Sequence, residues 1–244
     1  MIRLVSNTAE AAPSSWETVP LGAFAAAVVE GAQQSRAVTH GCVAKRGPLV
    51  VAVNGRSGAG KSTLARTLAE ALDEAGHRVA LLAADDLMWW EPMWEWAPLA
   101  IGGVLGPLQQ GESVHFTPPQ WRARGRPGAI RIAADTEVVL FEGVGSSQQA
   151  FTDYLDASIW VQSDHVTARQ EGVARDIASG VNGDPVEAAA FWDDWDASES
   201  AFLEQDQPWD RAGWTVLGNN VDAWPPGAVR VARPALVQWR SAQA

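Results

Sequence analysis

Cysteine, lysine and tyrosine are scarce in this chain of 244 residues, and long apolar runs are missing. Cys42 is the only cysteine, which excludes an intrachain disulfide and a metal site built from several cysteines. No apolar run approaches the length that crosses a bilayer, and residues 1–8 lack the basic stretch and apolar core of a signal peptide. The four histidines have no metal-ligand spacing. We therefore expect a cytoplasmic protein.

Basic residues are outnumbered, with 18 Lys and Arg against 29 Asp and Glu and a net charge of −11. This balance argues against general binding to nucleic acids or to an anionic membrane, so neither is expected as a partner. A local cavity can still oppose the global charge and bind a small anion. Because the stretch 122–131 is rich in arginine within an acidic chain, a homodimer remains an alternative to a monomer.

Apolar, β-branched runs alternate with stretches of helical periodicity, which predicts right-handed βαβ units and an α/β fold with a doubly wound parallel β-sheet flanked by helices. The strand-like runs are residues 49–53, 78–84, 137–143, 157–162 and 214–218. The helix-like stretches are residues 21–35, 62–76, 166–179 and 186–205. We expect residues 1–20 to be loose.

Two parts of the chain are predicted from these patterns. Residues 1–36 form an N-terminal segment with a leading helix, and residues 37–244 form a single domain. Within the domain, residues 88–135 are rich in Trp, Pro, Gly and Arg and show little periodicity. A long irregular stretch inside a compact domain is usually functional or mobile.

Residues 55–62 read GRSGAGKS and fit the Walker A pattern G-x-x-x-x-G-K-[ST], between an apolar strand and an amphipathic helix. The glycines let successive backbone N–H groups point at one centre, and the helix N-terminus favours an anion. Lys61 supplies a compact charge for the phosphates, which the broad fork of arginine would not fit, and Ser62 can place its hydroxyl on Mg²⁺. The expected nucleotide-binding residues here are Gly55, Arg56, Ser57, Gly58, Ala59, Gly60, Lys61, Ser62 and Thr63.

Carboxylates follow two of the expected strands, where ligands of doubly wound sheets lie. Asp85 and Asp86 end the second strand, and either could hold and deprotonate an attacking hydroxyl. Glu142 ends the third strand and would sit beside Mg²⁺ or its waters. The alternatives are a helix cap or turn for the aspartate pair, and an ordinary strand-end acid for Glu142.

Four motifs in order, GRSGAGKST, DDLM, the EG that follows an apolar strand, and DASIWVQSDHVTARQEGVARDI, resemble the uridine kinase and phosphoribulokinase-like family of P-loop kinases. The resemblance covers roughly residues 48–218. It implies a nucleoside-kinase-like three-layer α/β/α P-loop NTPase fold. It also implies transfer of a phosphoryl group from ATP, with Mg²⁺, to a hydroxyl of a small molecule.

The resemblance also assigns roles to single residues. Asp85 matches the family's general base, and Asp86 occupies the variable next position as a second choice. Arg175 matches an arginine of a lid at about residues 163–190 that reaches the ATP phosphates, and Arg169 lies near another. The expected magnesium ligands are Ser62, Glu142 and Asp85.

The acceptor side departs from the family. Met88 replaces an aromatic residue, Glu171 and Gly172 replace a double arginine, and Trp121 stands near an expected tyrosine. Five tryptophans and three arginines could contact the acceptor, or could pack the core and line a solvated face. They are Trp89, Trp90, Trp94, Trp96, Trp121, Arg122, Arg124 and Arg126. The acidic, Trp-rich stretch 191–210 is interpreted as structural.

A nucleoside is the favoured acceptor, with a sugar-like or pantothenate-like alcohol as the alternative. A nucleotide-binding regulatory protein, or a nucleotide-binding protein without turnover, also stays open. Residues 219–222 read NNVD and lack the lysine of the N-K-x-D element that reads guanine, so a GTP switch is not indicated.

Overall fold

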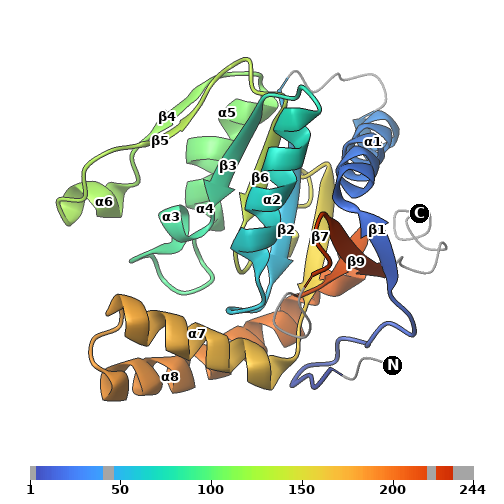
Figure 1. Cartoon of the computed structure of the whole chain (residues 1–244). Helices are drawn as coiled ribbons and strands as arrows, with labels where there is room; N and C mark the ends of the chain where they lie inside the picture. Colours follow the sequence, from blue (N-terminus) through green and yellow to red (C-terminus); the bar gives the residue numbers. More distant parts are fainter. Residues whose placement is uncertain (1–3, 41–46, 219–223, 233–244) are drawn as a thin grey trace.

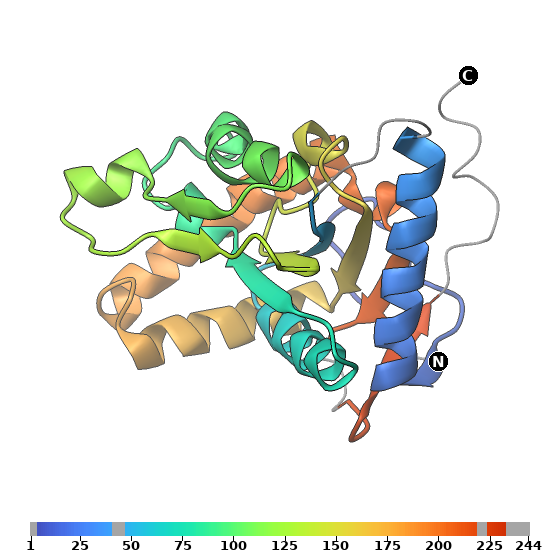
Figure 2. The same cartoon turned by 90° about the horizontal axis from the view of Figure 1, so that it is seen from above.

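The computed structural model describes residues 4–40, 47–218 and 224–232, and it contains a mostly parallel sheet with helices on both faces (Figures 1 and 2). Cys42, Lys45 and the stretch 219–222 lie outside the described residues. The strand order in the sheet is β1-β9-β8-β7-β2-β6-β3. The strands are β1 (Glu17–Pro20), β2 (Leu49–Gly55), β3 (Val79–Ala83), β6 (Val138–Glu142), β7 (Ala157–Gln162), β8 (Trp214–Leu217) and β9 (Ala228–Ala232).

The five strands predicted from apolar runs, β2, β3, β6, β7 and β8, pair in parallel with one another, so the predicted fold class is confirmed. The main helices also lie where the periodicity predicts them. They are α1 (Leu21–His40), α2 (Lys61–Glu74), α7 (His165–Ser179) and α8 (Pro185–Asp206). None of the described helices is long and apolar enough to span a bilayer.

Each face of the sheet has its own apolar core, because successive strand residues point to opposite sides. Val51 and Leu140 face a core shared with α1 and α2. Val50 and Phe141 face a second core, which packs against the segment from residue 82 to residue 132. Strands buried on both faces explain why the sequence shows continuous apolar runs here.

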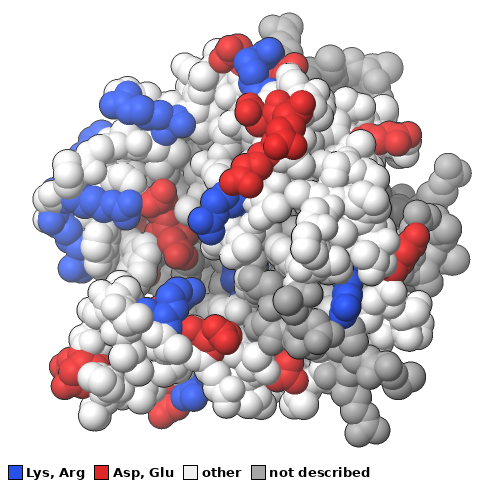
Figure 3. Space-filling model, viewed as in Figure 1, with Lys and Arg blue, Asp and Glu red and all other residues white. Residues whose placement is uncertain are grey.

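The predicted irregular region 88–135 contains regular structure, which corrects the sequence interpretation. Its short elements are α3 (Asp85–Met88), α4 (Ala97–Ala100), the π-helix η1 (Ile101–Leu105), α5 (Gly106–Gln109), α6 (Pro119–Ala123) and the antiparallel pair β4 (Val114–Phe116) and β5 (Ile130–Ile132). Together β4, α6 and β5 form an arm that projects from the domain, over which Lys and Arg side chains gather (Figures 1 and 3). α4, η1 and α5 follow one another directly and form one helical run over residues 97–109, but the prolines and glycines in it argue against a helix at the level of sequence. α3 and α6 are too short to show a helical period.

The expectation of a loose N-terminus is wrong for the described residues. β1 pairs with β9, and β9 pairs with β8, in antiparallel fashion at the edge of the sheet. Upstream of β1, Glu10 is buried and pairs with the buried guanidinium of Arg56 at 3.3 Å. Thr8 also accepts a hydrogen bond from Arg56. The segment is therefore fastened to the phosphate loop by contacts that no local pattern encodes.

Replacing Glu10 by alanine should destabilise the fold, because it leaves the buried guanidinium of Arg56 without its counter-charge. We expect the free energy of unfolding to fall by about 3 kcal/mol in urea titration. Glu70→Ala is the matched control at an exposed position on α2, where a change within about 0.5 kcal/mol is expected. Equal effects of the two substitutions would contradict a structural role for the Glu10 pair.

Two short 3-10 helices complete the described chain, η2 (Gln149–Phe151) and η3 (Pro208–Arg211). Phe151 of η2 belongs to the second core, and Trp209 of η3 packs against a small cluster around Trp160. The helix α7 begins at an N-cap, Asp164, whose side chain accepts a hydrogen bond from the Thr167 backbone N–H at 2.9 Å. α8 begins at Asp184, which forms a capping box with Glu187.

Candidate active site

The phosphate-loop sequence connects β2 to α2 at the carboxyl edge of the sheet. Gly58 and Gly60 adopt positive φ angles of 78° and 93°, which L residues with side chains disfavour. A Cβ on Gly58 would also lie only 1.9 Å from the backbone oxygen of Ala168, at the start of α7. The glycine spacing therefore serves both the curl of the loop and the close approach of α7.

Lys61 is buried and turns back into the loop, where its Nζ donates a hydrogen bond to the Arg56 carbonyl at 2.7 Å. Burial lowers the pKa of Lys61, while the charges of Glu199, Glu142 and Asp85 act to raise it. One ammonium group thus lies among three carboxylates. The structure brings the Walker A lysine together with both predicted strand-end acids.

The parallel register explains why these acids meet. Val53 of β2 and Ala83 of β3 are both aligned with Glu142 of β6, so the ends of the three strands lie side by side. The Ser62 hydroxyl donates a hydrogen bond to Glu142 Oε2 at 3.0 Å. Burial raises the pKa of the Glu142 carboxyl, and Lys61 and the Ser62 hydrogen bond oppose that effect.

Asp85 and Asp86 have different surroundings although they are neighbours in α3. Burial raises the pKa of Asp85, against the charges of Lys61 and Arg175. The carboxylate of Asp86 is instead held by Arg126 at 2.6 Å, and its carbonyl accepts a hydrogen bond from the Trp121 indole. Asp85 therefore belongs to the phosphate-loop cluster, and Asp86 anchors the arm.

A cavity of about 550 Å³ opens beside this cluster, between residues 85–96 on one side and helices α7 and α8 on the other. Ser57 of the phosphate loop and Asp85 share its wall. Its lining residues are Ser57, Asp85, Met88, Trp89, Trp90, Glu91, Met93, Trp96, Arg175, Asp176, Ser179, Val181, Asn182, Phe191, Trp192 and Trp195. The lining is mainly aromatic and apolar.

The two predicted lid arginines are placed differently. Arg175 lines the cavity and forms an ion pair at 2.8 Å with the buried carboxylate of Asp176. Arg169 forms an ion pair with Asp193 of α8 and is not among the cavity-lining residues. The structure thus brings Arg175, but not Arg169, to the cavity shared with Asp85.

The predicted tryptophan group divides between the cavity and the packed interior. Trp89, Trp90 and Trp96 line the cavity. Trp94 stacks on Phe202 with ring centroids 4.2 Å apart, and Trp121, which belongs to α6 of the arm, is buried. Trp90 and Trp94 both have φ near 68°, which is unusual for residues with a side chain and is found where function or packing imposes strain.

Helix α8 takes part in the site, which the structural interpretation of residues 191–210 missed. The Trp195 indole donates to the Ser57 hydroxyl at 2.9 Å, and the Ser57 backbone N–H donates to Glu199 Oε1 at 2.8 Å. Trp192 lines the cavity on the same helix face. The spacing of residues 192, 195 and 199 puts them on one stripe, a signal that the sequence already carried.

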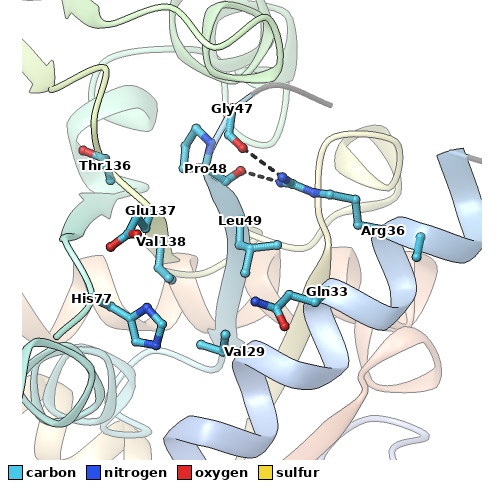
Figure 4. A pocket seen from close by; sticks show the side chains of 11 residues that line it. Val29, Gln33, Arg36, Gly47, Pro48, Leu49, His77, Thr136, Glu137 and Val138 are labelled. Carbon is cyan, nitrogen blue, oxygen red and sulfur yellow. Dashed lines mark hydrogen bonds between the residues drawn. The ribbon is translucent and has the colours of Figure 1, made fainter. Parts of the chain in front are cut away.

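A second cavity, of about 530 Å³, lies near the start of β2 and is separate from the catalytic candidates (Figure 4). Its polar side chains include Gln33, His77 and Arg36. The Arg36 guanidinium donates hydrogen bonds to the carbonyls of Gly47 and Pro48 and forms an ion pair with Asp156. This cavity has no phosphate loop and none of the strand-end acids.

Comparison with known proteins relates the chain to nucleotide-binding folds. A family model for an AAA domain matches residues 30–88, which is less than half of the chain. D-glycerate 3-kinase from Cryptococcus neoformans var. grubii is 14% identical and superposes with a TM-score of 0.58, covering 88% of this chain and 99% of that one. A possible uridine kinase from Bacillus stearothermophilus is 16% identical over 75% of this chain and 96% of that one, with a TM-score of 0.42. No curated protein sequence matches the chain.

At sequence identities this low, a structural match shows a shared fold and nothing finer. The matched AAA region contains β2, the Walker A sequence, α2 and β3, so its likeness lies in the part of the chain that carries the Walker A pattern. The glycerate kinase covers nearly all the described elements. The resemblance found in the sequence is confirmed at this level, and the chain has the α/β/α fold of the P-loop kinases.

Proposed function

We propose that the chain is an ATP-dependent kinase that transfers the γ-phosphoryl group to a hydroxyl of a small molecule, with a nucleoside as the favoured acceptor. One observation carries this proposal. Ser57 of the phosphate loop and Asp85 line the same cavity, so a phosphate on the loop and a hydroxyl in the cavity would meet there. A switch protein would have no need of such a cavity beside its phosphate loop.

The loop residues would hold the triphosphate. Backbone N–H groups of residues 57–62 and the Lys61 ammonium would surround the phosphates, with the dipole of α2 adding to the attraction. ATP would replace the Arg56 carbonyl as the partner of Lys61. Thr63, at the exposed start of α2, follows the loop and could contact the nucleotide from the same side.

The donor set suits a magnesium ion that arrives with ATP. No cluster of three or more acidic, His or Cys ligands exists among the described residues, and Mg²⁺ commonly uses one or two carboxylates together with substrate phosphates. Ser62 and Glu142, already joined at 3.0 Å, would hold it, with Asp85 nearby. When bound, Mg²⁺ neutralises charge on the transferred phosphoryl group.

Asp85 would orient the acceptor hydroxyl and take its proton. Its raised pKa makes it a better proton acceptor than an ordinary aspartate, and it lies at the boundary of the loop and the cavity. Arg175 lines the same cavity and would stabilise charge on the moving phosphoryl group. Asp86 is a weaker candidate because Arg126 already occupies its carboxylate.

The charge of the cavity favours an acceptor without an anionic group. Asp85, Glu91 and Asp176 line it, whereas Arg175, the single cationic side chain among its described lining residues, is paired with Asp176. A carboxylate or phosphate on the acceptor would find no free counter-charge among these residues. Aromatic faces can instead stack on a neutral ring, which suits a nucleoside better than a pantothenate-like alcohol.

Acceptor-dependent release of ADP tests the proposal. Nucleosides, neutral sugars, pantothenate and glycerate are added in turn to protein, ATP and Mg²⁺, with Lys61→Ala as the blank. We expect release with one or more nucleosides and none with the two carboxylates. Tight ATP binding with no response to any alcohol would contradict the kinase proposal and favour a regulatory protein.

Removal of the Trp89 side chain should weaken acceptor binding selectively. Its indole is 38% exposed and lines the cavity, so Trp89→Ala deletes a stacking surface without opening the core. We expect the acceptor KM to rise by about tenfold, while the dissociation constant of ATP stays unchanged. Trp16→Ala, in the N-terminal segment, is the control, and an equal KM change there would argue against stacking on Trp89.

A further inference from the structure

Glu199 of α8 reaches the phosphate loop, although the proposed reaction gives it no role. Its carboxylate is 2% exposed and accepts a hydrogen bond from the Ser57 backbone N–H at 2.8 Å. Among the acids near Lys61, its charge has the largest raising effect on the pKa of the lysine. A buried carboxylate needs such partners, because an uncompensated charge in the interior is costly.

The position of Ser57 shows which end of a nucleotide this carboxylate would face. Ser57 is the loop residue that lines the acceptor cavity together with Asp85. Transfer to an acceptor in that cavity requires the γ-phosphate to lie at the same end of the loop. The N–H bonded to Glu199 is therefore at the γ end and not at the α end.

We propose that Glu199 competes with the γ-phosphate for the Ser57 N–H and so sets the preference between ATP and ADP. Its carboxylate accepts the hydrogen bond of the Ser57 N–H and attracts the Lys61 ammonium. The γ-phosphate would make both of these interactions in the complex with ATP. ATP would therefore displace this carboxylate from the Ser57 N–H, and the two anionic groups would repel each other. The inference rests on the proposed function, because it assumes that the loop binds ATP.

The repulsion is selective because it falls with distance. The γ-phosphate would lie nearest to Glu199, whereas the α- and β-phosphates lie deeper in the loop, toward the start of α2. Glu199 thus acts as a positioning residue that disfavours the triphosphate more than the diphosphate. The Trp195 indole donates a hydrogen bond to the Ser57 hydroxyl at 2.9 Å, so the loop stays bonded to α8 when the Ser57 N–H leaves Glu199.

Glu199→Gln isolates the charge, because the amide oxygen can still accept the Ser57 N–H. Binding of a non-hydrolysable ATP analogue and of ADP, each with Mg²⁺ and without acceptor, is measured by calorimetry. We expect the analogue to bind about tenfold more tightly in the variant and ADP to change by less than about twofold. Glu204→Gln is the matched control on the same helix, since Glu204 contacts the Ala9 backbone N–H instead of the loop.

Tighter binding of the analogue alone supports the inference, whereas equal changes for both nucleotides, or weaker binding of the analogue, overturn it. If wild-type protein binds neither nucleotide, the proposed function fails and the inference fails with it. A structure of the wild-type protein with the analogue gives a test that needs no variant. We expect Ser57 N to have left Glu199 there, and a retained 2.8 Å bond would overturn the inference.

Discussion

Replacement of Lys61 by alanine is expected to lower kcat/KM for phosphoryl transfer by about 10³-fold or more, because the other cation of the loop, Arg56, is already paired with Glu10. Lys61 is the buried ammonium among Glu199, Glu142 and Asp85. Without it, these carboxylates would repel the phosphates. The measurement is acceptor-dependent ADP release, together with calorimetric binding of ATP, which should weaken as well.

Lys61→Arg is the matched variant, since it keeps the charge and changes the shape. The planar guanidinium is broader than an ammonium and does not fit inside a loop that closes on the Arg56 carbonyl at 2.7 Å. We therefore expect Lys61→Arg to be nearly as inactive as Lys61→Ala. Full activity of either variant, with an unchanged thermal midpoint, would contradict the assignment of this loop as the ATP site.

Replacement of Asp85 by asparagine should lower kcat by about 10²- to 10⁴-fold, because the amide cannot accept the proton of the acceptor hydroxyl. ATP binding should persist, since Lys61, Ser62 and the loop N–H groups are untouched. Stopped-time assays of phosphorylated product give kcat, and calorimetry gives the dissociation constant of ATP. A loss of both would indicate that Asp85 holds the nucleotide and not the acceptor.

Asp86→Asn is the neighbouring control for that experiment. The Asp86 carboxylate is bound to Arg126, whose guanidinium lies 3.5 Å from the centroid of the Trp121 ring. Its loss should loosen the arm and alter the acceptor KM, with a much smaller effect on kcat than Asp85→Asn. A larger fall in kcat for Asp86→Asn than for Asp85→Asn would reverse the assignment of the base.

Local sequence determined the phosphate-loop side of the candidate site. The apolar run of β2, the glycines of residues 55–60 and the helix that starts at Lys61 are consecutive, so their pattern specifies both their conformation and their position. Asp85 and Glu142 were predictable for a related reason. Parallel strands end at one edge of a sheet, and acids that follow two such strands must lie near each other.

Tertiary structure alone decided which side chains line the cavity and which segments are attached to the loop. Trp89 and Trp121 look alike in the sequence, yet Trp89 lines the cavity and Trp121 is buried within the arm. Glu10 and Glu199 reach the phosphate loop from segments 46 and 142 residues away. Contacts across such separations depend on how helices and strands pack, and no local period or motif encodes them.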